Sequence, residues 1–181
     1  ILVCKNRQLQ KCRLHNKNTT ANSFTGVLGA DAGGQTTANI KFYSADNDTN
    51  EGYLTLETRP ASGTPTEALR IDSSQRVLMG TTTEGYPSAD DLTIATSGST
   101  GITIRSGTGN LGTIAFSDAT SGSGEYQGYI QYAQDQNYMD FSVDAGSKIA
   151  LKINAESNVT AVGVVTATQF AATTINNSRK N

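Results

Sequence analysis

The stretch that decides the fold of this chain is EALRIDSSQRVLMGT, residues 67–81. Leu69 and Ile71 alternate with polar neighbours, which is the two-residue period of a β-strand with one apolar face. A polar cluster at residues 72–75 then reverses the chain, and an apolar run at residues 77–79 leads back. We therefore predict a β-hairpin across this stretch.

A weaker copy of the hairpin lies about eighty residues further on. Residues 150–154 (ALKIN) match residues 68–72 (ALRID), and residues 155–158 would form the turn. The returning strand, residues 159–163, has one extra residue in this alignment. We therefore expect at least two copies of one unit.

Longer strings between residues 24 and 170 carry a family resemblance. They read ALRIDSSQRVLMGTTTEGY, LTIATSGSTGITIRSGT, IAFSDATSGSGEYQGYIQY and VTAVGVVTATQF. They resemble the repeated modules of tail-fibre and related structural proteins of tailed bacteriophages, particularly marine cyanophages. The resemblance implies a non-enzymatic structural module of a tail fibre, located in the virion and outside the cell. It also implies a homotrimer that contacts other virion proteins and presents loops for host-surface attachment.

One position departs from that family pattern. The family reads D-S-S-G-R at the hairpin turn, and this chain has Gln75 in the glycine position. A left-handed backbone costs a non-glycine residue roughly 1–2 kcal/mol. We therefore expect a turn of a different type here.

The composition predicts an all-β fold built from repeated β-hairpin modules. The chain has 18 glycines in 181 residues, and hydrophobic residues make up only 36%. The aliphatic residues alternate singly with polar ones, so each strand covers one face only and needs a partner surface. Identical chains packed around a three-fold axis would supply that surface, which favours a homotrimeric fibre.

The pattern divides the chain into four parts. They are a basic, flexible head (1–23), a first β-repeat module (24–86), a second β-repeat module (87–163), and a C-terminal stem or start of a further module (164–181). Because the chain does not begin with Met, we expect a fragment or a processed product.

The second module is expected to repeat the order of the first. Residues 114–119 parallel residues 40–45, residues 128–130 parallel residues 52–54, and residues 138–143 form an added hairpin. Further strands are expected at 38–43, 53–58, 92–94, 102–104 and 114–116.

Charge is uneven along the chain. Residues 1–20 hold five of the 14 Lys and Arg residues and none of the 16 acidic ones, so the remainder is acidic. An acidic body excludes a nucleic-acid surface, which needs clustered Lys and Arg. No apolar run of 18 residues exists, so we expect neither membrane insertion nor a classical export signal.

Metal and cofactor motifs are incomplete. Cys4, Cys12 and His15 lack a fourth ligand and the short spacing of a zinc site, so free thiols are favoured. A second set of ligands imitates a calcium loop, but Glu51 occupies the position that needs glycine. That set is Asp46, Asp48, Asn50 and Glu57. We predict no bound metal.

A glycine motif at residues 107–112 matches a dinucleotide fingerprint by spacing alone. The motif requires a helix after it, and residues 113–116 are strand-like. We therefore predict no cofactor.

Catalysis is not predicted. His15 is the only histidine and lies in the head, which argues against a Ser/His/Asp set. A polysaccharide-cleaving tailspike would need paired carboxylates, for which Asp90 with Asp91 and Asp118 with Glu125 are the candidates. Besides this tailspike, an extracellular or cell-surface filament-forming β protein remains an alternative to the fibre.

Tyrosines cluster in the second module, at Tyr126, Tyr129, Tyr132 and Tyr138. Aromatic rings suit stacking on sugars, so these residues are candidates for contact with a host-surface glycan. Tyrosine also packs the edges of half-buried sheets, and the sequence leaves both interpretations open.

Overall fold

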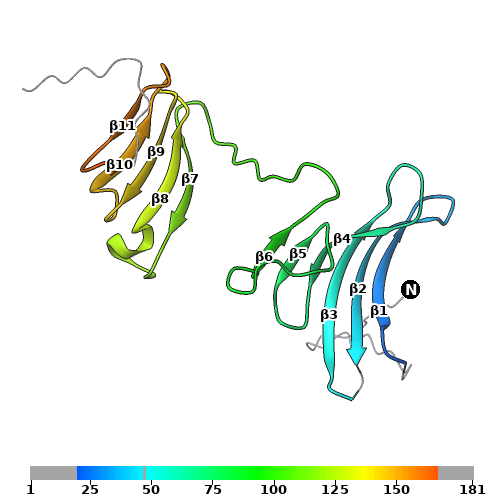
Figure 1. The fold of residues 1–181 in the computed structure, drawn as a ribbon. Coiled ribbons are helices and arrows are strands. Elements are labelled where there is room, and N and C mark those ends of the chain that lie inside the picture. The colour runs from blue at the N-terminus through cyan, green and yellow to red at the C-terminus, as the bar shows by residue number, and fades with distance from the viewer. Residues whose placement is uncertain (1–19, 47, 167–181) are drawn as a thin grey trace, which may run out of the picture. The chain divides into compact units, whose positions relative to one another are not determined.

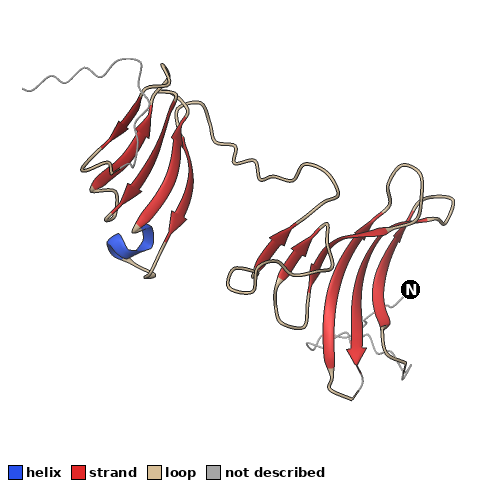
Figure 2. Cartoon of the chain, in the orientation of Figure 1, coloured by secondary structure: helices blue, strands red, loops and turns tan. Residues whose placement is uncertain are grey.

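The computed structural model describes residues 20–46 and 48–166. Within these residues the regular elements are strands, apart from one short 3-10 helix, η1 (Gly122–Tyr126) (Figure 2). The chain divides into two compact units, and the boundary between them falls between Gly101 and Ile102. Each unit contains one sheet. The all-β expectation is confirmed.

The first sheet has the strand order β1-β2-β3-β4-β5-β6 (Figure 1). Neighbouring strands are antiparallel except β5 and β6, which are parallel. The strands are β1 (Ser23–Ala30), β2 (Thr36–Asp46), β3 (Glu51–Thr58), β4 (Thr66–Ile71), β5 (Val77–Met79) and β6 (Leu92–Ile94).

The second sheet has the order β7-β8-β9-β10-β11 and is antiparallel throughout (Figure 1). The helix η1 lies in the connection between its first two strands. The strands are β7 (Leu111–Phe116), β8 (Gly128–Ala133), β9 (Tyr138–Val143), β10 (Lys148–Ile153) and β11 (Val159–Ala161).

The two sheets share one backbone plan, in which β1–β5 correspond to β7–β11. In the first sheet, Leu56 pairs with Ile40 and with Leu69. In the second, Phe141 pairs with Ile130 and with Leu151. The pairing of these central strands is therefore equivalent in the two sheets.

The same β-bulge occurs in both sheets. Ala68 lies unpaired between Glu67 and Leu69, where β4 slips against β3. Ala150 lies unpaired at the corresponding place, where β10 slips against β9. The carbonyls of these alanines accept equivalent hydrogen bonds, from the amides of Gly80 and Val162, both at 3.1 Å. A bulge bends a strand and increases its twist, so both sheets are reshaped at the same point.

The predicted hairpin at residues 67–81 is confirmed as β4–β5. Its copy is confirmed as β10–β11, but the expected extra residue in the returning strand is wrong. Met79 pairs with Leu69 and Ala161 pairs with Leu151, so the two hairpins have identical registers.

The expectation of a different turn type at Gln75 is also wrong. Gln75 has φ 68° and Ser157, at the equivalent place in the second hairpin, has φ 63°, so both are left-handed. In each turn this residue donates its amide to the carbonyl three positions back, at 3.0 Å. The Asp72 carboxylate also accepts hydrogen bonds from the amides of Ser74 and Arg76, both at 2.9 Å. These bonds offset the cost of the left-handed backbone.

Two further expectations need correction. The expected matches of residues 114–119 with 40–45 and of residues 128–130 with 52–54 are wrong, because the registers align β7 with β1 and β8 with β2. The hairpin at residues 138–143 is therefore not an addition, because β9 is the counterpart of β3. The expected strand at residues 102–104 is an extended segment without strand pairing.

The other expected strands are present, although the module boundary after residue 86 stays a prediction. In the structure β6 pairs with β5, so residues 92–94 belong to the first sheet. The proposed head lies almost wholly outside the described residues, as does most of the segment 164–181.

Candidate interaction faces

One face of the first sheet consists of aligned rows of apolar side chains. Residues paired directly across a sheet project from the same side, so the registers of β1 to β6 define this face. We call it the first apolar face; its members are Val27, Ile40, Phe42, Leu54, Leu56, Leu69, Ile71, Val77, Met79, Leu92 and Ile94.

The second sheet carries an equivalent surface, which we call the second apolar face. Met139, Phe141 and Val143 project from one side of β9. Its members are Ile114, Phe116, Ile130, Tyr132, Met139, Phe141, Val143, Leu151, Ile153, Val159 and Ala161.

Both apolar faces are open to solvent. Val27 is 57% exposed, Phe42 47% and Phe116 58%. Among the described residues the only buried hydrophobic side chains are Leu78 and Ala133, and both project from the opposite faces. A single chain therefore has no conventional apolar core in the part that the structure describes.

On the opposite face of the first sheet, polar side chains lie over the sheet and shield it from solvent. The carboxylate of Glu57 lies 2.8 Å from Lys41 Nζ and accepts a hydrogen bond of 2.8 Å from Asn39. Glu57 and Asn39 are each 7% exposed, and Thr55, on the same face, is fully buried. Long side chains lying flat on the sheet bury their own stems and the residues between them.

Ion pairing sets the protonation of this network. Burial alone would raise the pKa of Glu57, but hydrogen bonds from Lys41 and Asn39 outweigh it and lower that pKa below its usual value. Burial alone would lower the pKa of Lys41, and the bond to Glu57 reverses that effect, so this pKa is raised. The pair is therefore ionised at neutral pH.

Aromatic rings extend the same face toward β1. Tyr43 stacks on Tyr53 with ring centroids 4.5 Å apart, and Phe24 lies 5.3 Å from Tyr43. Lys41 lies 4.6 Å from the centroid of Phe24, and Arg70 lies 4.2 Å from that of Tyr53. These rings are packed on each other and on cations, which stabilises the sheet.

The opposite face of the second sheet carries a buried carboxylate. Asp140 is 2% exposed and Ser142 is 3% exposed. Asp140 Oδ1 has no hydrogen-bond partner, while the Ser142 hydroxyl donates to the Lys148 carbonyl at 3.0 Å. Burial raises the pKa of Asp140, and the charge of Lys152 only partly opposes that rise. Asp140 occupies the place that corresponds to Thr55 in the first sheet.

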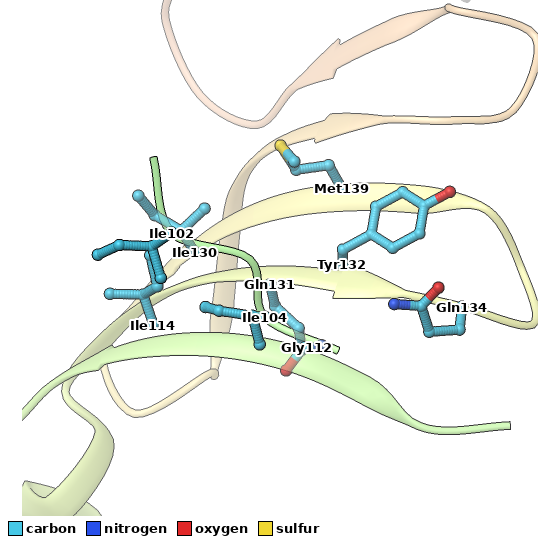
Figure 3. A pocket seen from close by; sticks show the side chains of 9 residues that line it. All are labelled: Ile102, Ile104, Gly112, Ile114, Ile130, Gln131, Tyr132, Gln134 and Met139. Atoms are coloured by element: carbon cyan, nitrogen blue, oxygen red, sulfur yellow. The ribbon is translucent and has the colours of Figure 1, made fainter. Parts of the chain in front are cut away.

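A groove of about 260 Å³ lies on the second apolar face (Figure 3). One wall comes from the extended segment at residues 102–104, and the floor comes from the sheet. The lining residues are Ile102, Ile104, Gly112, Ile114, Ile130, Gln131, Tyr132, Gln134 and Met139.

The structure does not gather the four tyrosines proposed for glycan contact. Tyr129 and Tyr138 project from the polar face of the second sheet, and Tyr132 from the apolar face. Tyr126 lies in η1 and is 46% exposed. Lys152 Nζ lies 3.5 Å from the Tyr138 ring centroid, so one side of that ring is occupied.

The residues weighed for metal binding are engaged elsewhere. Asp46 accepts a hydrogen bond from the Asp48 amide at 2.8 Å, whereas Glu57 belongs to the polar network. Among residues 20–46 and 48–166, no group of three His, Cys, Asp or Glu side chains is placed to hold a metal ion. Cys4, Cys12 and His15 lie outside the described residues.

Among the carboxylates considered for catalysis, Asp90 takes part in an ion-pair network, whereas Asp118 and Glu125 are exposed to solvent. Asp90 is bound to Arg76 at 2.9 Å, and the same guanidinium binds Asp72 at 2.7 Å. Asp118 and Glu125 are exposed on the connection that contains η1.

No helix in the described part of the chain is long and apolar enough to span a membrane.

The comparisons with known proteins gave structural matches only. No family model and no curated protein matches the chain. It is similar to the carboxy-terminal domain of the bacteriophage T5 L-shaped tail fibre with its intramolecular chaperone domain, with 12% identity and a TM-score of 0.45. That match covers 97% of this chain and 68% of the other. A second structure of the T5 domain matches with 12% identity and a TM-score of 0.37, covering 96% of this chain and 98% of the other.

Proposed function

We propose that this chain is a structural, non-enzymatic module of a bacteriophage tail fibre. Its copies associate as a homotrimer through the two apolar faces, span distance along the fibre, and belong to the virion outside the cell. The observation that carries the proposal is that both sheets present apolar rows to solvent while their polar faces are covered by their own side chains. Burial of apolar area is the main driving force of association.

The size of the two faces suits a stable interface. A face of five or six strands about 4.8 Å apart and roughly 20 Å long has a flat area of about 500 Å². Two such faces give about 1,000 Å² per chain, compared with roughly 800 Å² per partner in a standard protein interface. Other copies of the chain carry the same two faces, so self-association supplies the apolar surface that each face needs.

The choice of three copies rests on the resemblance of the sequence strings to phage fibre modules. Loops at the ends of the sheets would then be repeated around the axis and available to a host-surface glycan. The connections between β2 and β3 and between β7 and β8 are the two we propose for presentation, and Tyr126 lies in the second of them. Other virion proteins would contact the ends of the module.

Light scattering over a range of protein concentrations tests the assembly. We expect the mass of three chains at every concentration. A single-chain mass would contradict the proposal, and a mass that grows with concentration would favour the filament-forming alternative. Ile114→Asp is expected to prevent assembly, whereas Thr113→Asp, on the adjacent residue and the opposite face, is expected to preserve it.

Two binding experiments test the role of the assembled protein. Labelled protein is expected to bind host cells and to lose that binding when the surface polysaccharide is removed. The same polysaccharide, incubated with the protein, is expected to show no new reducing ends. Release of reducing ends would overturn the non-enzymatic assignment and favour the tailspike.

A further inference from the structure

The segment at residues 102–104, which we call the arm, precedes β7 in the second unit. The arm is extended but does not pair as a strand, and it lies against the edge of the second apolar face. A Cβ at Gly112 would lie 3.5 Å from Ile104 Cγ2, an ordinary van der Waals distance, so the arm packs directly against β7 at this residue. The corresponding position in the first sheet is Thr25.

The arm covers only part of the face. Figure 3 shows Ile102 and Ile104 beside Ile114 and Ile130, with Met139 standing apart across the groove. Ile102 remains 69% exposed and Ile104 45% exposed. Both the arm and the groove beside it are therefore apolar surfaces left uncovered within one chain.

We propose that the groove on the second apolar face receives the arm of a second copy of this chain. This inference rests on the proposed self-association and names the contact that would join neighbouring copies. The face already holds one Ile-Thr-Ile segment, and the part of the groove across from it presents the same kind of apolar surface through Tyr132 and Met139. No charged residue lines the groove, so an uncharged, apolar segment is the matching occupant.

The geometry of such a contact also bears on the number of copies. Arm and groove are different patches of one chain, so two copies can exchange arms reciprocally, or each copy can pass its arm to the next in a head-to-tail contact. Head-to-tail contacts close into rings when the rotation permits, and otherwise continue as filaments. A small apolar ligand in the groove would leave Ile102 exposed, whereas a second copy covers the arm and the groove together.

Disulfide trapping between two differently marked chains tests the contact. Both chains carry Cys4→Ser and Cys12→Ser; one also carries Ile102→Cys and the other Met139→Cys. They are co-expressed, exposed to a mild oxidant and separated on a non-reducing gel. We expect a covalent dimer of the two different chains. The matched control replaces Met139→Cys by Thr160→Cys, which lies on the other face of the same sheet and is expected to give no dimer.

Light scattering on the same samples distinguishes a failure of the arm contact from a failure of the proposed self-association. Assembled protein without the disulfide between positions 102 and 139 would overturn the arm contact and leave the proposed function standing. A single-chain mass would overturn both. Equal trapping with the Thr160→Cys control would also overturn the arm contact, because it would indicate random collision. Far-ultraviolet circular dichroism confirms that each variant retains its strands.

Discussion

The two sheets share strand order, register, bulge and hairpin turn, but they differ in what covers their faces. The first sheet carries the ion pair of Lys41 and Glu57 on its polar face, and Val27 and Phe42 on its apolar face are exposed. The second places Asp140 on the polar face and lays Ile102 and Ile104 along the apolar one. The backbone plan thus depends on strand alternation and the shared bulge rather than on any particular polar pair.

The largest expected effect comes from placing a charge on each apolar face at equivalent positions. Leu56→Asp and Phe141→Asp change paired residues that correspond between the sheets. If the faces are buried between copies, each carboxylate costs several kcal/mol, because an unpaired charge is transferred out of water. We expect light scattering to show a single-chain mass for both variants, with Thr113→Asp as the assembled control.

Normal assembly of one of the two variants would show that the two apolar faces do not contribute equally to self-association. An unaffected Leu56→Asp protein would show that the second face alone holds the copies together. An unaffected Phe141→Asp protein would assign that role to the first face.

A smaller effect is expected from removing the cation of the polar network. Lys41→Met leaves the Glu57 carboxylate buried with Asn39 as its remaining partner, which costs about 2 kcal/mol of stability. Urea unfolding at neutral pH measures the loss. Lys148→Met is the control, because the ion pair of Lys148 with Asp144 is exposed, and we expect no measurable loss from it.

The pH dependence of the same pair gives an independent check. The folded-state pKa of Glu57 is lowered, so its stabilising contribution is complete above the ordinary pKa of 4.5 and is lost as pH falls through the folded value. We expect the difference in stability between wild type and Lys41→Met to shrink over that acidic range. A difference that stays constant with pH would show that lost packing, not lost charge, causes the effect.

The sequence allowed the strands to be predicted but not their alignment. Alternation identified the hairpin at residues 67–81 and its copy, because a strand with one apolar face has a two-residue period. It could not separate β7 from β2, since Ile114 and Phe116 alternate in the same way as Ile40 and Phe42. The result was an alignment displaced by one strand.

The polar network was missed for a related reason. Lys41 and Glu57 are 16 positions apart in the sequence and meet only through the register of β2 and β3. The available signal was the row of polar residues between the apolar ones, which include Lys41, Thr55 and Arg70. Without the register, that row could be interpreted only as a solvated surface.

Exchanging Thr55 and Asp140, which occupy equivalent places on the two polar faces, tests whether the difference between these residues affects stability. Asp140→Thr gives the second sheet the residue found at position 55 and removes a buried carboxylate oxygen that lacks a partner. We expect a gain of about 1–2 kcal/mol at neutral pH, and a loss for the reciprocal Thr55→Asp. Urea unfolding measures both.

The gain from Asp140→Thr is expected to depend on pH. Because burial raises the folded-state pKa of Asp140, the penalty is complete above that value and disappears as pH falls toward the ordinary pKa of 3.8. The gain should therefore shrink on acidification. A gain independent of pH would assign the effect to side-chain packing rather than to the buried charge.

The smallest expected effect concerns the left-handed residue in the hairpin turns. Gln75→Gly relieves the backbone at φ 68° and is expected to stabilise the chain by up to about 1 kcal/mol. The turn after β1 provides the reverse test, because Asp31 and Gln35 form the same hydrogen bonds around Gly34, at φ 79°. A Cβ at Gly34 would meet nothing within 4 Å, so Gly34→Gln measures the backbone cost alone. Opposite shifts of similar size in the urea midpoint are expected, and a destabilised Gln75→Gly protein would show that the glutamine side chain contributes contacts that outweigh its backbone.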